Sequence, residues 1–337
     1  MIASDVLSVN DKDRTTVFPL IDTHTHFDAP MFDDDRVRQA HLAYDKGVRH
    51  LLLVGYLHRH FSRLYDTQQQ LNSLHKTNTA IDGDKENLLP KMHIALGLHP
   101  FYIEQHTDAH LEAMVQMLNA NRPLAIGEIG LDTFTDTMKQ PEMMAKQQRF
   151  FVAQLDMAVA HQLPVMLHIR KAHAEALALL KAHDYDARKL GGIAHSFSGG
   201  IQEAKAFVKM GFKLGVTGQI TNPNAKKLRL AIQAAVKSYG IECLVIETDC
   251  PDMTPIMCQQ SNNGQSALGQ SSDNGSSDNE WGNEWGNAPS YNRNVPANLP
   301  YVLTSLSELL DIPTNILAEQ LWHNSCNALR TKWSYPL

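Results

Sequence analysis

Short apolar runs recur along the chain at intervals that suit strands alternating with helices. The first run, 17–21, leads directly into the sequence Ile-Asp-Thr-His-Thr-His at 21–26. Seven further runs follow, at 48–55, 93–98, 124–129, 164–168, 192–195, 212–217 and 243–247. Because strands alternating with helices form βαβ units, this pattern predicts a parallel sheet.

Between these runs, apolar residues return with helical spacing, most clearly at 36–46, 58–74 and 140–161. The same periodicity resumes after the eighth run, at 299–310 and 313–329. Eight strand–helix units in 337 residues favour a closed (β/α)8 TIM barrel. A doubly wound open sheet is the alternative, but that fold typically has a glycine-rich loop after the first strand, where this chain has His-Thr-His.

The domain prediction follows from two changes in composition. Residues 1–16 form a polar tail, and 17–335 are predicted to form one barrel domain. A low-complexity insertion at about 259–290 interrupts that domain, and its Ser, Asn, Gln and Gly content favours disorder. Trp281 and Trp285 in this insertion fit a linker better than a stacking platform for a base.

Composition and charge narrow the class of protein. The chain is 43% hydrophobic and 20% charged, as in a soluble globular protein. Its net charge of -6 argues against a broad basic surface for duplex DNA, although bound metals can attract a nucleotide locally. No apolar run approaches membrane-spanning length, and the N-terminus lacks a signal pattern. The four cysteines have no CxxC pairing, which fits a reduced compartment, so we predict a cytoplasmic enzyme. We also expect the protein to be a monomer.

Histidines and carboxylates stand at or just beyond the ends of the runs, where a parallel barrel places its active site. Side chains two residues apart in a strand point the same way, so His24 and His26 share one side. Such a pair alone is more often solvated or part of the core than a metal site. The other runs extend the set with His99, Glu128, His168, His195 and Asp249. Together these residues predict a metal centre.

The donor types indicate which ions fit. Imidazole nitrogen combined with carboxylate oxygen suits Zn, Mn, Fe or Mg, and the absence of cysteine argues against a structural zinc site. This set holds too many ligands for one ion that must keep an open position, so we expect them to divide between two ions. Two divalent ions would outweigh the charges of Glu128 and Asp249, and the positive pocket suits a phosphate.

These motifs resemble the TatD family of metal-dependent hydrolases, within the amidohydrolase-like TIM barrels, and especially its uncharacterised bacterial hydrolases. The resemblance runs from about residue 20 to residue 329. It rests on IDTHTHFD at 21–28, ALGLHP at 95–100, AIGEIGLD at 125–132, PVMLHIRKAH at 164–173, HSFSGG at 195–200 and ETDCPDM at 247–253. In order and content, these motifs are far more specific than a lone HxH.

The resemblance also implies roles for individual residues. A first metal would be held by His24, His26, Glu128 and Asp249, and a second by Glu128, His168 and His195. Glu128 would bridge the two ions, Asp249 would accept the proton of the attacking water, and His99 would contact the scissile phosphate. Some amidohydrolases carry a carboxylated lysine at the bridging position, and Glu128 disfavours that subclass here.

For each of three residues near these ligands, the sequence allows two roles. Glu247 points to the same face as Asp249, and either supports the ligands or is a buried polar partner. Arg170 either binds a substrate phosphate or pairs with Glu247 or Asp132. His173 fits the helix after the fifth strand better than the site.

The family includes 3′→5′ exonucleases and deoxyribonucleases, so we expect a two-metal phosphodiesterase acting on single-stranded DNA or frayed ends. A metal-dependent hydrolase of small amides or esters is the alternative, and a non-catalytic metal-binding scaffold is disfavoured by the full ligand set. Two departures from the family are the long loop beside the site and an insertion at 77–86, expected at the opposite face.

Overall fold

The computed structural model describes residues 16–78, 88–259 and 292–336. The predictions for the N-terminal tail, the insertion at 77–86 and the low-complexity insertion with its two tryptophans therefore lie almost entirely outside the described residues. No helix in the described part of the chain is long and apolar enough to cross a bilayer.

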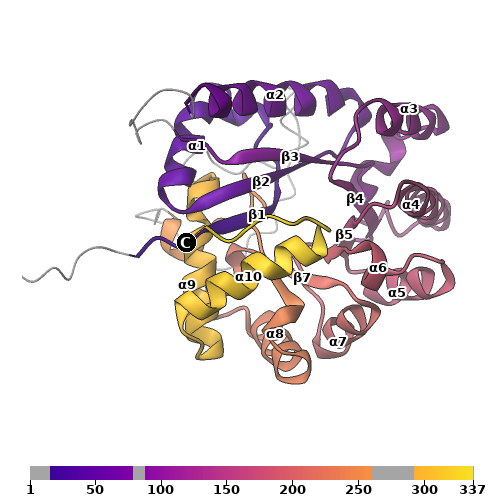
Figure 1. Ribbon diagram of the computed structural model, residues 1–337. Helices are drawn as coiled ribbons and strands as arrows, with labels where there is room; N and C mark the ends of the chain where they lie inside the picture. The colour runs from indigo at the N-terminus through magenta and orange to yellow at the C-terminus, as the bar shows by residue number, and fades with distance from the viewer. Residues whose placement is uncertain (1–15, 79–87, 260–291, 337) are drawn as a thin grey trace, which may run out of the picture.

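Eight parallel strands form one sheet whose spatial order is the order of the chain (Figure 1). The strands are β1 (Leu20–Thr25), β2 (Val48–Val54), β3 (Lys91–Leu96), β4 (Ala125–Asp132), β5 (Val165–Arg170), β6 (Ile193–Ala194), β7 (Lys213–Val216) and β8 (Leu244–Ile246). This sequential order confirms the predicted (β/α)8 TIM barrel, because a doubly wound sheet reverses its strand order in the middle.

Helices surround the sheet on the outside (Figure 1). They are α1 (Arg36–Asp45), α2 (Phe61–Asn78), α3 (Asp108–Ala120), α4 (Pro141–His161), α5 (His173–Ala182), α6 (Ala187–Leu190), α7 (Ile201–Met210), α8 (Lys226–Tyr239), α9 (Leu299–Leu310) and α10 (Thr314–Ala328). The helices predicted at 36–46, 140–161, 299–310 and 313–329 agree with α1, α4, α9 and α10 to within a residue or so. His173 is the first residue of α5, as predicted.

The two ends of the sheet meet where β8 lies beside β1. The hydroxyl of Thr23 donates to the carbonyl of Ile246 at 3.1 Å, and the amide of Asp249 donates to the carbonyl of His24 at 2.9 Å. These bonds close the barrel. They also bring the end of β8 directly against the strand that carries the histidine pair.

The N-terminal end of the barrel is plugged by α10, which crosses that end in Figure 1. The side-chain amide of Asn324 donates to the carbonyls of Ile241 and Leu244, both at 2.8 Å. Ala328 and Leu329 pack into the interior with apolar side chains from the strands. These strand residues are Leu52, Val54, Ala95, Ala125, Met166, Ile193 and Val245. The N-terminal end of the barrel is thus closed, which leaves the C-terminal end for an active site.

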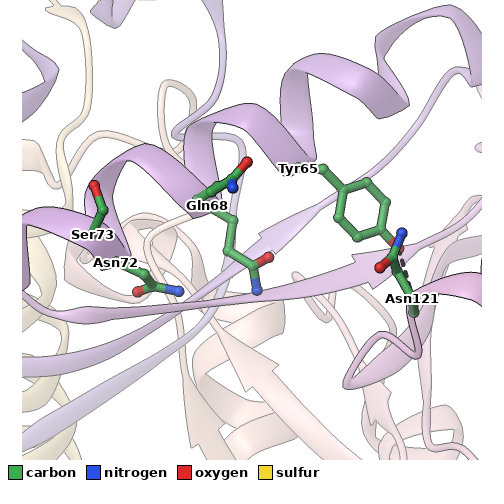
Figure 2. Close-up of a pocket in the computed structure, with 6 residues that line it drawn as sticks. Tyr65, Gln68, Asn72, Ser73 and Asn121 are labelled. Carbon is green, nitrogen blue, oxygen red and sulfur yellow. Dashed lines mark hydrogen bonds between the residues drawn. The ribbon is translucent and has the colours of Figure 1, made fainter. Parts of the chain in front are cut away.

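A polar cavity of about 510 Å³ lies on the outside of the barrel, between α2 and the start of β3 (Figure 2). The side-chain amide of Asn72 both donates to and accepts from the backbone of Met92, at 2.9 Å each. The hydroxyl of Tyr65 donates to the carbonyl of Asn121 at 3.1 Å. The bonds of Asn72 fasten α2 to the N-terminal end of β3, and the bond of Tyr65 fastens it to the end of α3. Among the described residues, no charged side chain lines the cavity.

Candidate active site

Glu128 in β4 lies at the centre of the site and is 1% exposed. Its Oε2 atom is 3.2 Å from Nε2 of His24 and 3.4 Å from Nε2 of His26. Although buried, Oε2 has no well-formed hydrogen bond among the described residues. The ligand atoms of these three residues all lie within 4.8 Å of one another. A buried carboxylate oxygen facing two imidazole nitrogens has the chemistry of a divalent-metal site.

The second oxygen of Glu128 faces a different group of histidines. Oε1 is 2.7 Å from Nδ1 of His168 and 3.2 Å from Nε2 of His99. It also lies 3.5 Å from Nε2 of His195. Each oxygen of this one carboxylate therefore points toward its own set of ring nitrogens, as a bridging ligand requires.

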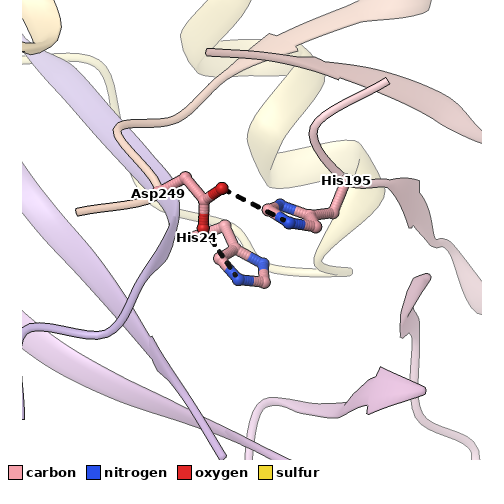
Figure 3. Close-up of side chains that lie close together, drawn as sticks. All are labelled: His24, His195 and Asp249. Carbon is pink, nitrogen blue, oxygen red and sulfur yellow. Dashed lines mark ion pairs between the residues drawn. The ribbon is translucent and has the colours of Figure 1, made fainter. Parts of the chain in front are cut away.

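Asp249 follows β8, and its carboxylate lies beside His24 and His195 (Figure 3). Its Oδ1 atom is 3.6 Å from Nε2 of His24, and its Oδ2 atom is 3.7 Å from Nε2 of His195. The two imidazole rings stack with centroids 3.5 Å apart. The backbone of Asp249 is in the left-handed region, with φ 54°, which a non-glycine residue keeps only where its surroundings fix it.

Hydrogen bonds on the far side of three rings determine which nitrogen carries the proton. The acceptors are the carbonyl of Val54 for Nδ1 of His26 at 3.0 Å, Asp132 for Nε2 of His168 at 2.9 Å and Glu247 for Nδ1 of His195 at 3.0 Å. In the neutral ring each acceptor takes the one N–H, so the opposite nitrogen keeps a lone pair for a metal ion, as in metal-ligating histidines. His24 differs, because its Nδ1 is buried without a hydrogen-bond partner in the described part of the chain.

His99 shows the reverse arrangement. The backbone N–H of Phe101 donates to Nδ1 of His99 at 2.9 Å, so that nitrogen carries no proton. In the neutral ring the proton is therefore on Nε2, the atom that faces Glu128. The geometry makes His99 a hydrogen-bond donor into the site and distinguishes it from the three histidines above.

All the residues predicted to hold metal thus converge at the C-terminal end of the barrel, whereas Arg170 takes neither of the ion pairs considered for it. The guanidinium of Arg170 lies over the ring of Phe134, with Cζ 3.4 Å from the centroid. The carboxylates of Asp132 and Glu247 instead bond to His168 and His195. The contact of Glu247 is that of a residue supporting a ligand.

The orienting role of Asp132 was missed by the sequence analysis, which considered this residue only as a partner for Arg170. A signal was present, because Asp132 stands four residues after Glu128 and so on the same face of β4. Tyr56 and Tyr102 also line the site, from the loops after β2 and β3, and no periodicity in the sequence marked them.

Burial and neighbouring charges shift the pKa values of the site residues in different directions. Burial lowers the pKa of His24 and that of His195 to about 3, so both rings are neutral at pH 7. Burial alone would lower the pKa of His168, but hydrogen bonds to Asp132 and Glu128 outweigh it and raise that pKa to about 9. Burial, with the charge of Glu128, raises the pKa of Asp249 well above its usual range.

These shifts predict that metal loading releases protons. Without metal, His168 is protonated at pH 7, because its pKa is raised to about 9. An ion that takes Nδ1 must displace that proton, so we expect affinity to rise with pH from about 7 to 9. Titration calorimetry with Mn²⁺, in buffers of different ionisation enthalpy, measures the protons released. Binding heats that do not depend on the buffer would contradict the prediction.

Asp132 offers a second test of the site. Because it holds the ring of His168, we expect Asp132→Asn to weaken metal binding about 10- to 100-fold while leaving the fold intact. The matched control is Asp136→Asn, an exposed carboxylate in the loop after β4 that pairs with Lys139. Equal metal affinities of the two variants would show that Asp132 does not orient the ligand.

The site opens into a cavity of about 590 Å³ at the C-terminal end of the barrel. Glu128, His168, Asp249, Tyr102 and Arg170 are among the residues that line it. This volume is in the range of small-molecule and cofactor sites, so it accommodates a ligand the size of a nucleotide.

Comparison with known proteins agrees with this geometry. Residues 21–330 match the family model described as TatD related DNase. The chain is 36% identical over 236 residues to the uncharacterized metal-dependent hydrolase YjjV of Escherichia coli K12, covering 69% of this chain and 80% of that protein. It is 29% identical over 236 residues to the 3′-5′ ssDNA/RNA exonuclease TatD of Salmonella typhimurium LT2, covering 70% of this chain and 80% of that protein.

The same relationship holds in three dimensions. The crystal structure of YjjV, a TatD homologue from Escherichia coli K12, superimposes with a TM-score of 0.69 at 30% identity, covering 93% of this chain and 98% of that one. The chain therefore belongs to the TatD family of metal-dependent hydrolases.

Proposed function

We propose that this protein is a two-metal phosphodiesterase that removes nucleotides from the 3′ end of single-stranded DNA. The observation that carries the proposal is the position of Glu128, whose two oxygens face separate sets of ring nitrogens. Its relatives include proteins named 3′-5′ ssDNA/RNA exonuclease, which supports a single-stranded substrate. We further propose that it acts as a monomer in the cytoplasm, in line with its composition.

The donor set fits two divalent ions. One would be held by His24, His26, Glu128 and Asp249, and the other by Glu128, His168 and His195. The unsatisfied Oε2 of Glu128 supports this assignment, because a buried carboxylate oxygen is costly to leave without a partner. The mixture of nitrogen and oxygen donors suits Zn, Mn or Mg.

Bound divalent ions would supply Lewis-acid polarisation of the phosphoryl oxygen and a nucleophile at neutral pH. The residues of the chain perform the remaining tasks. Asp249, whose carboxylate lines the cavity, accepts the proton of the attacking water. The Nε2–H of His99 donates a hydrogen bond to a non-bridging phosphate oxygen, and Arg170 adds positive charge at the lining of the cavity.

End-labelled DNA tests the proposed function. With Mn²⁺ present, a 5′-labelled single strand should yield progressively shorter labelled products, whereas a 3′-labelled strand should release labelled mononucleotide from the first turnover. Chelation should stop both reactions, and added metal should restore them. Metal-loaded protein that cleaves small amide or carboxylic ester substrates but no phosphodiester would overturn the proposal.

A further inference from the structure

An exposed aromatic ring stands at the edge of the active-site cavity, two residues after the end of β4. Phe134 is 42% exposed, although most phenylalanines in the structure are buried. Two cations gather on its ring. Cζ of Arg170 lies 3.4 Å from the ring centroid, and Nζ of Lys171 lies 4.6 Å from it. Because Arg170 also lines the cavity, this cluster continues the cavity wall outward.

The backbone holds the cluster in place. The amide and hydroxyl of Thr133 donate to the carbonyls of Arg170 and Lys171, at 3.0 and 2.9 Å. The amide of Phe134 donates to Oδ1 of Asp132 at 2.7 Å. The other oxygen of that carboxylate bonds to His168, so one side chain positions both the ring and a proposed metal ligand.

Each cation of the cluster has a carboxylate in its vicinity. Lys139, and to a smaller extent Lys171, lowers the pKa of Asp136. Neither Arg170 nor Lys171 forms an ion pair within the part of the chain that the structure describes. Arg170 lies near enough to Asp252 to oppose the burial that raises the pKa of that carboxyl, but without direct contact. Two cations and an exposed ring are the elements with which proteins bind single-stranded nucleic acid, by stacking a base and pairing a phosphate.

We propose that Phe134, Arg170 and Lys171 form a second subsite, which stacks a base of the single strand and binds its adjoining phosphate outside the cavity. This inference rests on the proposed function and names its substrate class more closely. The cavity holds about one nucleotide, so a strand that reaches Phe134 must extend beyond the nucleotide being removed. The subsite therefore favours oligonucleotides over dinucleotides and small phosphate diesters.

Binding and hydrolysis measured side by side test the subsite. The binding probe is a fluorescent phosphorothioate dT octamer, with anisotropy read on the Mn²⁺-loaded protein. Phe134→Ala should weaken its binding roughly 5- to 100-fold and raise KM for dT octamer similarly, while KM for bis(p-nitrophenyl) phosphate stays unchanged. Phe134→Trp should retain binding, whereas Phe134→Leu, which is apolar but has no π face, should not.

Salt dependence and a surface control complete the design. Lys171→Gln should reduce the slope of log affinity against log salt by about 0.7, the value for one phosphate contact on a single strand. Tyr239→Ala removes another exposed aromatic ring, at the C-terminus of α8, and should change nothing.

Two results with the Phe134→Ala variant would overturn the subsite. One is octamer binding by Phe134→Ala equal to that of the wild type. The other is a loss that affects the small diester and the octamer alike. Wild-type protein that hydrolyses the small diester but does not bind the octamer would keep the phosphodiesterase proposal and remove the subsite, so the two failures are distinguishable.

Discussion

Replacing Glu128 by alanine is expected to lower the proposed nuclease activity on the order of 10³-fold or more and to reduce bound metal below the two ions per chain that we propose. Each oxygen of this side chain faces its own set of histidines, so its removal takes a ligand from both sites at once. Metal ions contribute several kcal/mol of charge stabilisation, and each 1.36 kcal/mol is a factor of ten in rate. Elemental analysis and hydrolysis of labelled single-stranded DNA measure the two effects.

Two further variants test whether the loss of activity comes from the carboxylate of Glu128. Glu128→Gln keeps the volume of the side chain but not its charge, and should be as inactive as the alanine variant. Glu175→Ala removes an exposed carboxylate of α5 and should match wild type. Activity that survives both substitutions of Glu128 would identify a contaminating nuclease and remove the assignment.

Asp249→Asn is expected to lower kcat about 10²- to 10⁴-fold with a much smaller effect on KM. The amide keeps an oxygen toward His24 and His195 but has no basic carboxylate, so it cannot perform the proton transfer that we propose for Asp249. General-base catalysis typically contributes a factor of this size. Steady-state kinetics at saturating Mn²⁺ separates lost proton transfer from weaker metal binding.

The matched control for Asp249 is Asp184→Asn, an exposed carboxylate after α5 that should leave kcat unchanged. A change confined to KM, with kcat retained, would assign Asp249 to substrate binding. Full recovery of kcat at high Mn²⁺ would limit its role to holding the ion.

The barrel and the convergence of the ligands could be predicted from the sequence because both follow from strand alternation. Parallel strands ending at one rim bring His24, Glu128 and Asp249 together wherever loops lie in between. Strand limits were less accurate. The first apolar run spans 17–21, yet β1 begins only at Leu20 and continues to Thr25, because His24, near the end of the strand, is itself buried between β2 and β8.

The contacts behind the ligands could not be predicted in the same way. That Asp132 bonds to His168 depends on the register of β4 against β5, which has an irregularity between Ile126 and Ile129. The tautomer of His99 depends on the turn that brings the amide of Phe101 onto its ring. Phe134 was not singled out either, because one aromatic residue in a loop has no periodicity to read.

The most direct test of the account is a titration of metal-free protein with Mn²⁺, followed by electron paramagnetic resonance and nuclease activity together. A carboxylate bridging two ions through Glu128 predicts two Mn²⁺ per chain, an exchange-coupled spectrum, and activity that appears with the second ion. A single equivalent of Mn²⁺ giving full activity, with the six-line spectrum of an isolated ion, would contradict it.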